Sequence, residues 1–334
     1  MILPHTNQQA ALTVILPTWD TFDALRTTVA HLRSQTVAGS IELIIVAPSA
    51  ERATPHAHEV QGLHSVRVLE TGDMHATGPA RAQAIRAASA SVVAFAEDHC
   101  FPRPDWAEAL IAAHRGPHAA VGPAVYNANP ETVTSWADLY LGYGRWLGPG
   151  RRREVALLPG HNSSYKRDVL VDYGGELDHL MEAETVLLWD LRRKGHTLLF
   201  EPAARVEHTN FSSFGVFIDV QWHLGRVFAA TRAAHWSLMR RLAYALAAPG
   251  IPFIRLSHIV HATASNGSSR RRLAATLPVI GAALLVDFAA QATGALFGAG
   301  RSVAILSAYE FHRVDVNRTK RRPTMQAAEV RRAT

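Results

Sequence analysis

The sequence is poor in cysteine: Cys100 is the single one among 334 residues. One cysteine excludes an internal disulfide framework and favours a reducing compartment. The first ten residues, MILPHTNQQA, lack the basic region and apolar core of a secretion signal. We therefore expect a protein that works inside the cell.

Two glycine motifs of nucleotide-binding proteins are also missing. The chain contains neither GxGxxG nor GxxxxGK[ST], whose backbone amides cradle phosphates, so dinucleotide-binding and P-loop interpretations lose their main support. The turn after the first apolar run, TWDTFDALR, carries no glycine or lysine. This disfavours a nucleotidyltransferase, which should have a phosphate loop rich in both.

Acidic residues are fewer than basic ones, 28 against 34, which gives a net charge of +6. The excess gathers in Arg151–Arg153, Arg270–Arg272 and Lys320–Arg322. These runs are separated and lack interleaved aromatics, so we expect no nucleic-acid partner. Basic residues beside an apolar segment indicate a membrane surface instead. For the tail, 321–334, a solvated and flexible basic segment is an equally good interpretation.

Apolar runs alternate with helical patterns over the first hundred residues. The pattern predicts strands at 12–17, 41–48, 66–70 and 91–100, and helices at 22–35 and 78–91. This alternation indicates an α/β fold with a mostly parallel sheet flanked by helices.

Three polar residues follow an apolar run abruptly. Val92–Ala96 is typical of a strand buried on both faces, and Glu97, Asp98 and His99 come directly after it, before Pro102 breaks the pattern. In open α/β sheets, ligands bind at the carboxyl ends of the strands. Two acids and an imidazole at such a place can hold a divalent metal, a ribose or both.

From residue 213 onward, alanine-rich apolar helical segments dominate. The longest, 273–300, exceeds the roughly 20 apolar residues that span a bilayer. Pro278, Asp287 and Gln291 nevertheless lie within it. A spanning helix, a re-entrant pair, an interfacial helix and a buried helical hairpin all fit this segment.

The motifs, taken in order, resemble those of the family 2 glycosyltransferases over residues 11–212. They are VILPTWD, GPARAQAI, FAEDHCFPRPDW, LPGHNSSYKRDVL, YGGELD, ETVLLWDLRRKGH and PAARVEH. The resemblance implies a GT-A catalytic domain over 11–212, followed by a helical region over 213–320. It also implies inverting transfer of a sugar from a nucleotide-sugar donor to a glycan or lipid-linked acceptor.

Carried over by position, the motifs assign the donor site. Its residues would be Pro17, Thr18, Ser49, Arg81, Glu97 and Asp98. One departure concerns the base of the nucleotide: Ala47 and Pro48 stand where the family has a pair of aspartates, which leaves Ser49 and backbone groups to contact the base.

The resemblance also implies a divalent metal, Mg²⁺ or Mn²⁺, and here the chain departs again. His99 stands where the family's last acid ligates the metal, Asp98 matches the acid before it, and His208 matches a terminal histidine. Imidazole is a poor ligand for Mg²⁺ but suits Mn²⁺. Either His99 binds the metal directly, or Asp98 binds it with His99 assisting, which we favour. A site without metal is the third interpretation.

For the general base, the family uses an acidic pair at the start of a helix. Those positions are Ala183 and Glu184 here, so we expect Glu184 to be the base, with Glu182 in reserve. A purely structural role at the helix start is the alternative. Asp178 matches an acid near the acceptor, which His161 and Asn162 would also contact.

The sequence thus predicts an enzyme at the cytoplasmic face of the plasma membrane, or in the cytoplasm. Replacement of the family's acids at positions 47, 48, 97, 99 and 183 supports an alternative. A non-catalytic relative with the same fold would bind a glycan or a protein partner.

Overall fold

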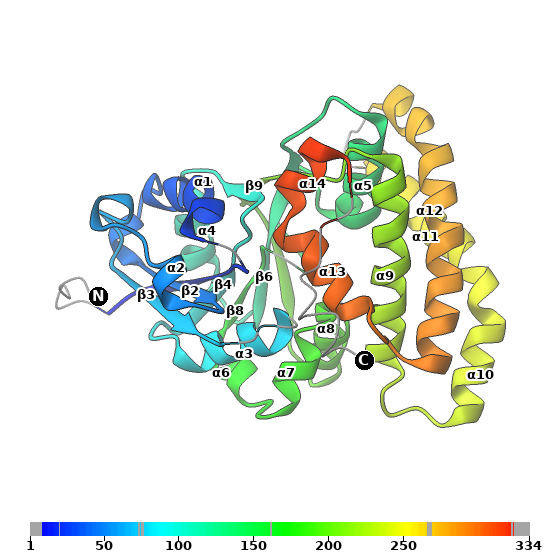
Figure 1. The fold of residues 1–334 in the computed structure, drawn as a ribbon, viewed down its shortest axis with the longest axis horizontal. Helices are drawn as coiled ribbons and strands as arrows, with labels where there is room; N and C mark the ends of the chain where they lie inside the picture. The colour runs from blue at the N-terminus through cyan, green and yellow to red at the C-terminus, as the bar shows by residue number, and fades with distance from the viewer. Residues whose placement is uncertain are drawn as a thin grey trace. The chain divides into compact units, whose positions relative to one another are not determined.

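The computed structural model describes residues 9–19, 21–72, 74, 77–160, 162–265, 269–321 and 323. The chain forms two compact units (Figure 1). The first contains the residues up to Tyr126 together with Gly148–His208, and the second contains Asn127–Leu147 together with the residues from Thr209 onward. The segment 127–147 thus belongs with the C-terminal helices. The boundary expected at residue 212 stays a prediction.

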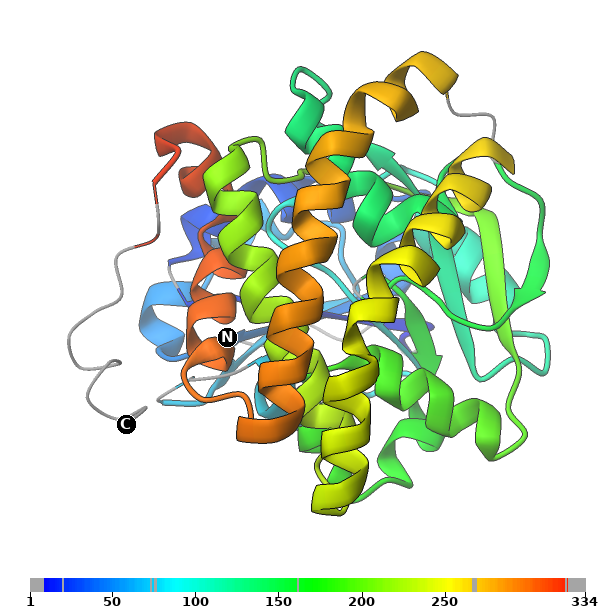
Figure 2. The same ribbon diagram turned by 90° about the vertical axis from the view of Figure 1, so that its right-hand side faces the viewer.

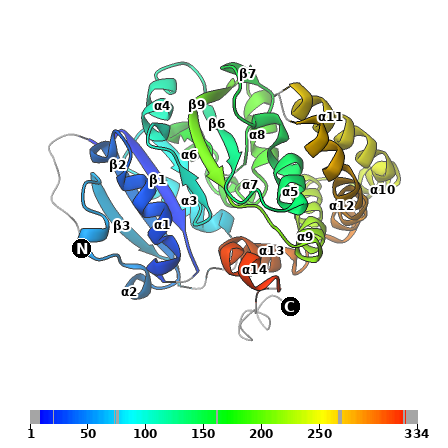
Figure 3. The same cartoon turned by 90° about the horizontal axis from the view of Figure 1, so that it is seen from above.

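Four parallel strands form one half of the sheet in the first unit. They are β1 (Leu12–Pro17), β2 (Ile41–Ala47), β3 (Ser65–Glu70) and β4 (Val92–Phe95), in the order β3-β2-β1-β4. Figure 3 shows β1, β2 and β3 side by side. Every residue of β1, β2 and β4 is buried, as expected of strands covered on both faces.

The other half of the sheet is mainly antiparallel. Its strands are β5 (Cys100–Pro102), β6 (Ala120–Asn127), β7 (Arg153–Val155), β8 (Ser164–Lys166) and β9 (Leu198–His208). The order continues from β4 through β8, β6 and β9 to β5, and β7 pairs with β9. The α/β fold is therefore confirmed, and the sheet is mixed.

Glu42, the second residue of β2, is a buried acid. Its carboxylate accepts hydrogen bonds from Thr13 Oγ1 (2.5 Å), the backbone and hydroxyl of Ser89 (2.8 Å each) and the Arg67 guanidinium (2.6 Å). Burial raises the pKa of Glu42, but these donors outweigh it and the net shift is downward. The acid is thus compatible with a strand covered on both faces.

The helices of the first unit pack apolar faces on the sheet. In α1 (Phe22–Arg33), Phe22, Leu25, Val29 and Leu32 recur every three or four residues and are buried. The others are α2 (Ala50–Ala53), α3 (Thr77–Ala87), α4 (Trp106–Ala113), α6 (Arg167–Val171), α7 (Glu176–Leu180) and α8 (Glu184–Arg193).

The end of α8 follows the expected glycine rule. Gly195 lies two residues beyond the last helical residue and adopts φ +90°, the left-handed conformation that terminates helices. This confirms the expected helix over the ETVLLWDLRRKGH motif.

The second unit is helical. Its helices are α5 (Val133–Tyr143), α9 (Phe214–Arg232), α10 (Leu238–Ala247), α11 (Ile251–Ser265), α12 (Arg270–Phe297), α13 (Ser302–Phe311) and α14 (Arg313–Thr319). The helix α12 packs against α5, α9, α10 and α11, and Figure 1 draws it between α9 and α11. It is the central helix of this unit.

The apolar segment 273–300 forms one continuous helix, α12, which ends where Gly298 takes φ +76°. The re-entrant pair and the helical hairpin are therefore wrong interpretations. Pro278 removes only one helical hydrogen bond, which the packing of α12 on four neighbours outweighs. The buried Asp287 accepts hydrogen bonds from Arg255 (2.5 Å) and Gln291 (2.8 Å).

Two helical stretches of the described chain are long and apolar enough to cross a bilayer: Leu238–Thr263, which is mostly exposed, and Arg270–Phe297, of which more is buried. This criterion concerns length and composition alone, and core helices of soluble proteins also meet it. The basic tail predicted over 321–334 lies outside the described residues, apart from Arg321 and Pro323.

Candidate active site

The loop Glu97–His99 joins two strands whose pairing positions it. The strand β4 ends at Phe95, and β5 starts at Cys100, which pairs directly with His208 in the antiparallel ladder with β9. This register brings His208 beside His99, with their ring centroids 5.1 Å apart and the rings nearly perpendicular. Two residues 109 positions apart in sequence thus share one site.

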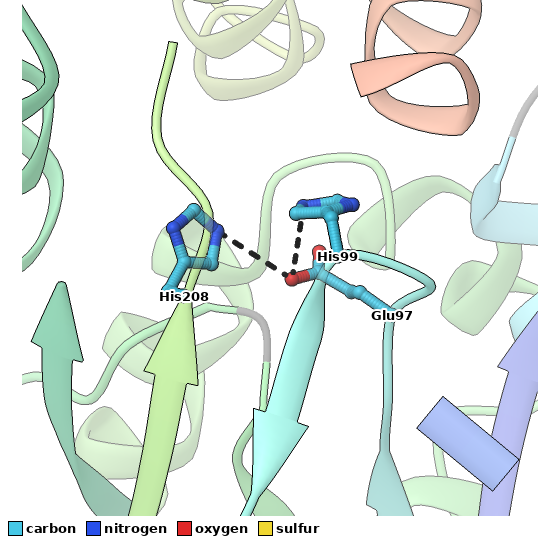
Figure 4. A group of neighbouring side chains, drawn as sticks. All are labelled: Glu97, His99 and His208. Atoms are coloured by element: carbon cyan, nitrogen blue, oxygen red, sulfur yellow. Dashed lines mark ion pairs between the residues drawn. The ribbon is translucent and has the colours of Figure 1, made fainter. Parts of the chain in front are cut away.

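The Glu97 carboxylate faces both rings (Figure 4). Its Oε2 lies 3.4 Å from Nε2 of His99 and 3.8 Å from Nε2 of His208. All three side chains are buried. One donor atom from each lies within 4.8 Å of the others, so the three residues can share one cation.

Asp98 contacts His99 from the opposite side of the ring. Its Oδ1 lies 2.6 Å from Nδ1 of His99. Because an ionised carboxylate only accepts hydrogen bonds, Nδ1 is the donor to Asp98, and Nε2, on the side of Glu97, is the ring nitrogen that could bind a cation. The structure therefore groups Glu97, expected on the nucleotide, with the two histidines, and it places Asp98, expected on the metal, behind His99.

The three residues fit a divalent transition metal. With metal–ligand bonds of roughly 2.0–2.2 Å, two ligands of one ion lie roughly 3–3.5 Å apart. The separations of 3.4 and 3.8 Å are close to this range. Two imidazoles and one carboxylate suit Mn²⁺ or Zn²⁺ better than Mg²⁺, which prefers oxygen ligands. A carboxylate behind a ligating histidine is the usual arrangement around such ions.

Gly160 and Asn162 lie between the cluster of Glu97, His99 and His208 and the first residue of α8. Asn162 adopts φ +66°, which asparagine tolerates better than most residues, and its Nδ2 donates to Glu97 Oε2 at 3.2 Å. A Cβ atom on Gly160 would lie 2.3 Å from Glu184 Oε2, so a larger residue there would displace the Glu184 carboxylate. The loop thus touches Glu97 at one residue and Glu184 at another. His161, expected with Asn162 on the acceptor side, lies outside the described residues.

Glu184 is the first residue of α8 and forms a buried ion pair. Its Oε1 accepts from NH1 of Arg81 at 2.9 Å, and the guanidinium also lies over the Phe95 ring. Burial, together with the negative charge of Glu184, raises the pKa of the adjacent Tyr165 hydroxyl. Arg81 was expected to contact the donor, and here it holds the residue expected to be the base.

Glu182 and Asp178 differ in their surroundings. Glu182 accepts a hydrogen bond from the backbone N–H of Gly78 at 2.9 Å, and burial raises the pKa of its carboxyl, to which the charge of Glu184 adds. Asp178 instead forms an exposed ion pair with Arg86 at 3.0 Å. Burial and the neighbouring Glu184 thus favour the protonated form of Glu182, whereas Asp178 lies at the surface.

The expected donor residues lie at the carboxyl ends of neighbouring strands. Pro17 ends β1, and the backbone N–H of the buried Thr18 donates to the Val46 carbonyl at 2.8 Å. Ser49 directly precedes α2, just after β2. Because β1, β2 and β4 are parallel, these ends and the loop at Glu97 share one edge of the sheet.

Sequence reasoning missed two residues at this edge. Glu70, the last residue of β3, accepts from the backbone N–H of Ala50 at 2.8 Å, and its place at a strand end was a usable signal. Thr28 on α1 donates its hydroxyl to the Glu97 carbonyl at 2.9 Å. Nothing in the helical pattern of α1 distinguishes this threonine from a packing residue.

Comparisons with known proteins identify a family and proteins of similar fold. Residues 13–174 match the family Glycosyl transferase family 2. Mannosyltransferase PcManGT from Pyrobaculum calidifontis, solved with GDP-Man and Mn²⁺, is 14% identical, with 87% of this chain and 89% of that chain covered and a TM-score of 0.50. TarS 1–349 of S. aureus is 15% identical, with coverages of 85% and 90% and a TM-score of 0.43. No curated protein sequence matches the chain. The likeness to the mannosyltransferase shows a shared fold.

Proposed function

We propose a reaction for this chain, which belongs to glycosyl transferase family 2 over residues 13–174 and is a glycosyltransferase of the GT-A fold. It transfers a sugar, with inversion, from a nucleotide-sugar donor to a hydroxyl of a glycan or lipid-linked acceptor. One observation carries the proposal: Glu97, His99 and His208 converge at the strand edge where a donor would bind.

On this proposal, the strand ends hold the donor. Thr18 and Ser49 contact the nucleotide from the ends of β1 and β2, and Asn162 keeps the Glu97 carboxylate oriented. A bound Mn²⁺ would neutralise the charge that develops on the diphosphate leaving group. Glu97, His99 and His208 would be its protein ligands, and Asp98 would fix the tautomer of His99.

The acceptor side needs a base. The acceptor hydroxyl attacks the anomeric carbon as the bond to the diphosphate breaks, and its proton passes to a carboxylate. We assign this role to Glu184, which the loop at Gly160 and Asn162 connects to Glu97. Glu182 is the second candidate, because its carboxyl is buried near Glu184 and its pKa is raised, which makes it a stronger base than an ordinary carboxylate. The domain boundary at residue 212 and an acceptor contact by Asp178 belong to the same proposal.

We place the enzyme at the cytoplasmic face of the plasma membrane. The family 2 domain fits a cytoplasmic location. The two long apolar helical stretches support contact with a membrane. A lipid-linked acceptor would be available at that surface.

Metal-dependent donor hydrolysis tests the proposal. The purified chain is incubated with a panel of UDP-, GDP- and dTDP-sugars, with Mn²⁺ or EDTA, and release of the nucleoside diphosphate is measured. We expect Mn²⁺-dependent release from one donor class, lost in Glu97→Gln. The matched control is Glu131→Gln, an exposed acid of the second unit, which should behave as the wild type. Release unaffected by EDTA, or equal in Glu97→Gln, would contradict the metal-assisted mechanism.

A further inference from the structure

The helices α10 and α11 expose an apolar surface. Joined by a short turn at Ala248–Gly250, they form the mostly exposed stretch Leu238–Thr263. Six apolar side chains along it, with exposed fractions from 40% to 83%, are here called the outer face. They are Leu238, Met239, Leu242, Leu246, Phe253 and Ile254. Spacings of three, four and seven residues place Met239, Leu242 and Leu246 on one side of α10.

Two polar side chains of the same helices point into the unit, whereas Arg240 on α10 and His258 on α11 are exposed. Tyr244 on α10 donates to Gln291 of α12, and Arg255 on α11 pairs with the buried Asp287 of α12 at 2.5 Å. A surface helix of a soluble protein ordinarily turns its apolar side inward and its polar side outward. Here large apolar side chains face outward although Tyr244 and Arg255 face inward, and Figure 2 shows α10 and α11 packed beside α12. The outer face therefore needs an apolar environment.

The charge of this part of the chain indicates which apolar environment covers the outer face. The sequence from Val220 to Val286 contains eight arginines and no acidic residue, so this stretch carries a net charge of +8 with histidines neutral. The exposed Arg240 lies near the start of α10, and the exposed Arg270 and Arg271 follow the end of α11. A second copy of the chain on this face would bring like charges together. Anionic lipid headgroups would be attracted instead.

We propose that the outer face docks on the surface of an anionic lipid bilayer, with α10 and α11 lying along the headgroup region. The proposal deepens the membrane location proposed above and rests on it. The sequence suggested membrane contact by the segment 273–300. The proposal assigns this contact to residues 238–265 instead. The polar bonds of Tyr244 and Arg255 to α12 tie one side of the pair to protein, so that only the outer face is left for lipid.

Vesicle flotation of the full chain tests this. The wild type should float with vesicles of phosphatidylcholine and phosphatidylglycerol, and about tenfold less with phosphatidylcholine alone or in high salt. The double variant Leu246→Glu and Phe253→Glu should lose at least about tenfold in partitioning, because two exposed apolar side chains that would enter the lipid are replaced by charges. Arg240→Gln with Arg270→Gln should weaken binding only to the anionic vesicles.

The control is Phe214→Glu, a similarly exposed phenylalanine on α9, which should float as the wild type does. Circular dichroism checks that every variant is folded. Failure of the wild type to float, unchanged flotation of the double variant, or resistance of bound protein to alkaline carbonate, as a spanning helix would show, overturns the proposal. So does a dimer in solution that the double variant breaks. Vesicle binding needs no donor, so loss of donor hydrolysis alone would contradict the proposed reaction and leave the docking surface standing.

Discussion

The carboxylate of Asp98 lies 2.6 Å from Nδ1 of His99, and this contact turns Nε2 of the same ring toward Glu97. Asp98, which was expected to bind the metal directly, is therefore positioned to orient His99, the proposed metal ligand. We predict that Asp98→Asn lowers Mn²⁺ affinity about 10- to 100-fold, the usual effect of changing such a partner. Titration with Mn²⁺, followed by electron paramagnetic resonance, measures this, and the exposed acid variant Glu131→Gln is the control. An unchanged Mn²⁺ affinity would show that Asp98 does not support metal binding.

A change at His99 should alter which metal works. Because Mg²⁺ prefers oxygen ligands and Mn²⁺ accepts imidazole, His99→Asp should raise donor hydrolysis with Mg²⁺ relative to hydrolysis with Mn²⁺. The ratio of the two rates, each at saturating metal, is the measurement. A ratio equal to that of the wild type would mean that His99 is not a ligand.

The two candidate bases make opposite predictions in a pair of variants. Replacement of the true base by glutamine should lower kcat about 10²- to 10⁴-fold and leave KM for the donor nearly unchanged. We expect this of Glu184→Gln, whose amide oxygen can still accept from Arg81. Glu182→Gln is the matched comparison. If Glu182→Gln alone abolishes transfer, Glu182 is the base and the role of Glu184 is to form the ion pair with Arg81.

Breaking the ion pair from its other side should affect stability. Arg81→Met leaves the buried Glu184 carboxylate without its guanidinium, which costs about 3–5 kcal/mol in comparable buried pairs. Chemical denaturation would measure the loss. The control Arg86→Met removes an exposed pair with Asp178, worth about 0–1 kcal/mol. Similar losses of stability in both variants would show that the buried pair of Arg81 with Glu184 stabilises the fold no more than an exposed pair does.

His114 gives a pH dependence of folding with a defined sign. Burial, together with the positive charges of Lys166 and His118, lowers the pKa of its imidazole from 6.5 to about 4. The unfolded chain therefore binds a proton there at a higher pH than the folded chain does. The contribution of His114 to stability is fully present above pH 6.5 and is lost as the pH falls toward 4, by about 3 kcal/mol in all.

His114→Gln should remove this slope. Glutamine can still donate to the Ser164 hydroxyl, which the imidazole contacts at 2.9 Å. The free energy of unfolding, measured at pH 7 and at pH 4.5, should fall less in the variant than in the wild type. An equal fall in both would show that His114 is not the responsible group.

The first half of the fold could be predicted from sequence because local patterns decided it. The runs at 12–17 and 41–48 are apolar apart from Thr13 and Glu42, and β1 and β2 form there with every residue buried. Gly195 likewise marked the end of α8. The antiparallel half was less accessible, because short strands such as β5 and β8 carry no periodicity of their own and depend on pairing with distant residues.

The site was predictable as a location but not as a set of contacts. The abrupt end of an apolar run pointed to Glu97, Asp98 and His99. Which of the two acids faces the histidines depends on the path of the loop into β5 and on the Asn162 amide, which comes from 65 residues away. The outward-facing apolar side chains of α10 and α11 were hidden for the same reason, since the inward contacts of Tyr244 and Arg255 are to Gln291 and Asp287 on another helix.

Calorimetric titration with UDP, GDP and dTDP, each in Mn²⁺ and in EDTA, tests the central claim most directly. The account predicts that one nucleotide binds in Mn²⁺, that EDTA abolishes the binding, and that Glu97→Gln weakens it in Mn²⁺ alone. Binding of no nucleotide under any condition would contradict it, as would binding that neither EDTA nor Glu97→Gln changes.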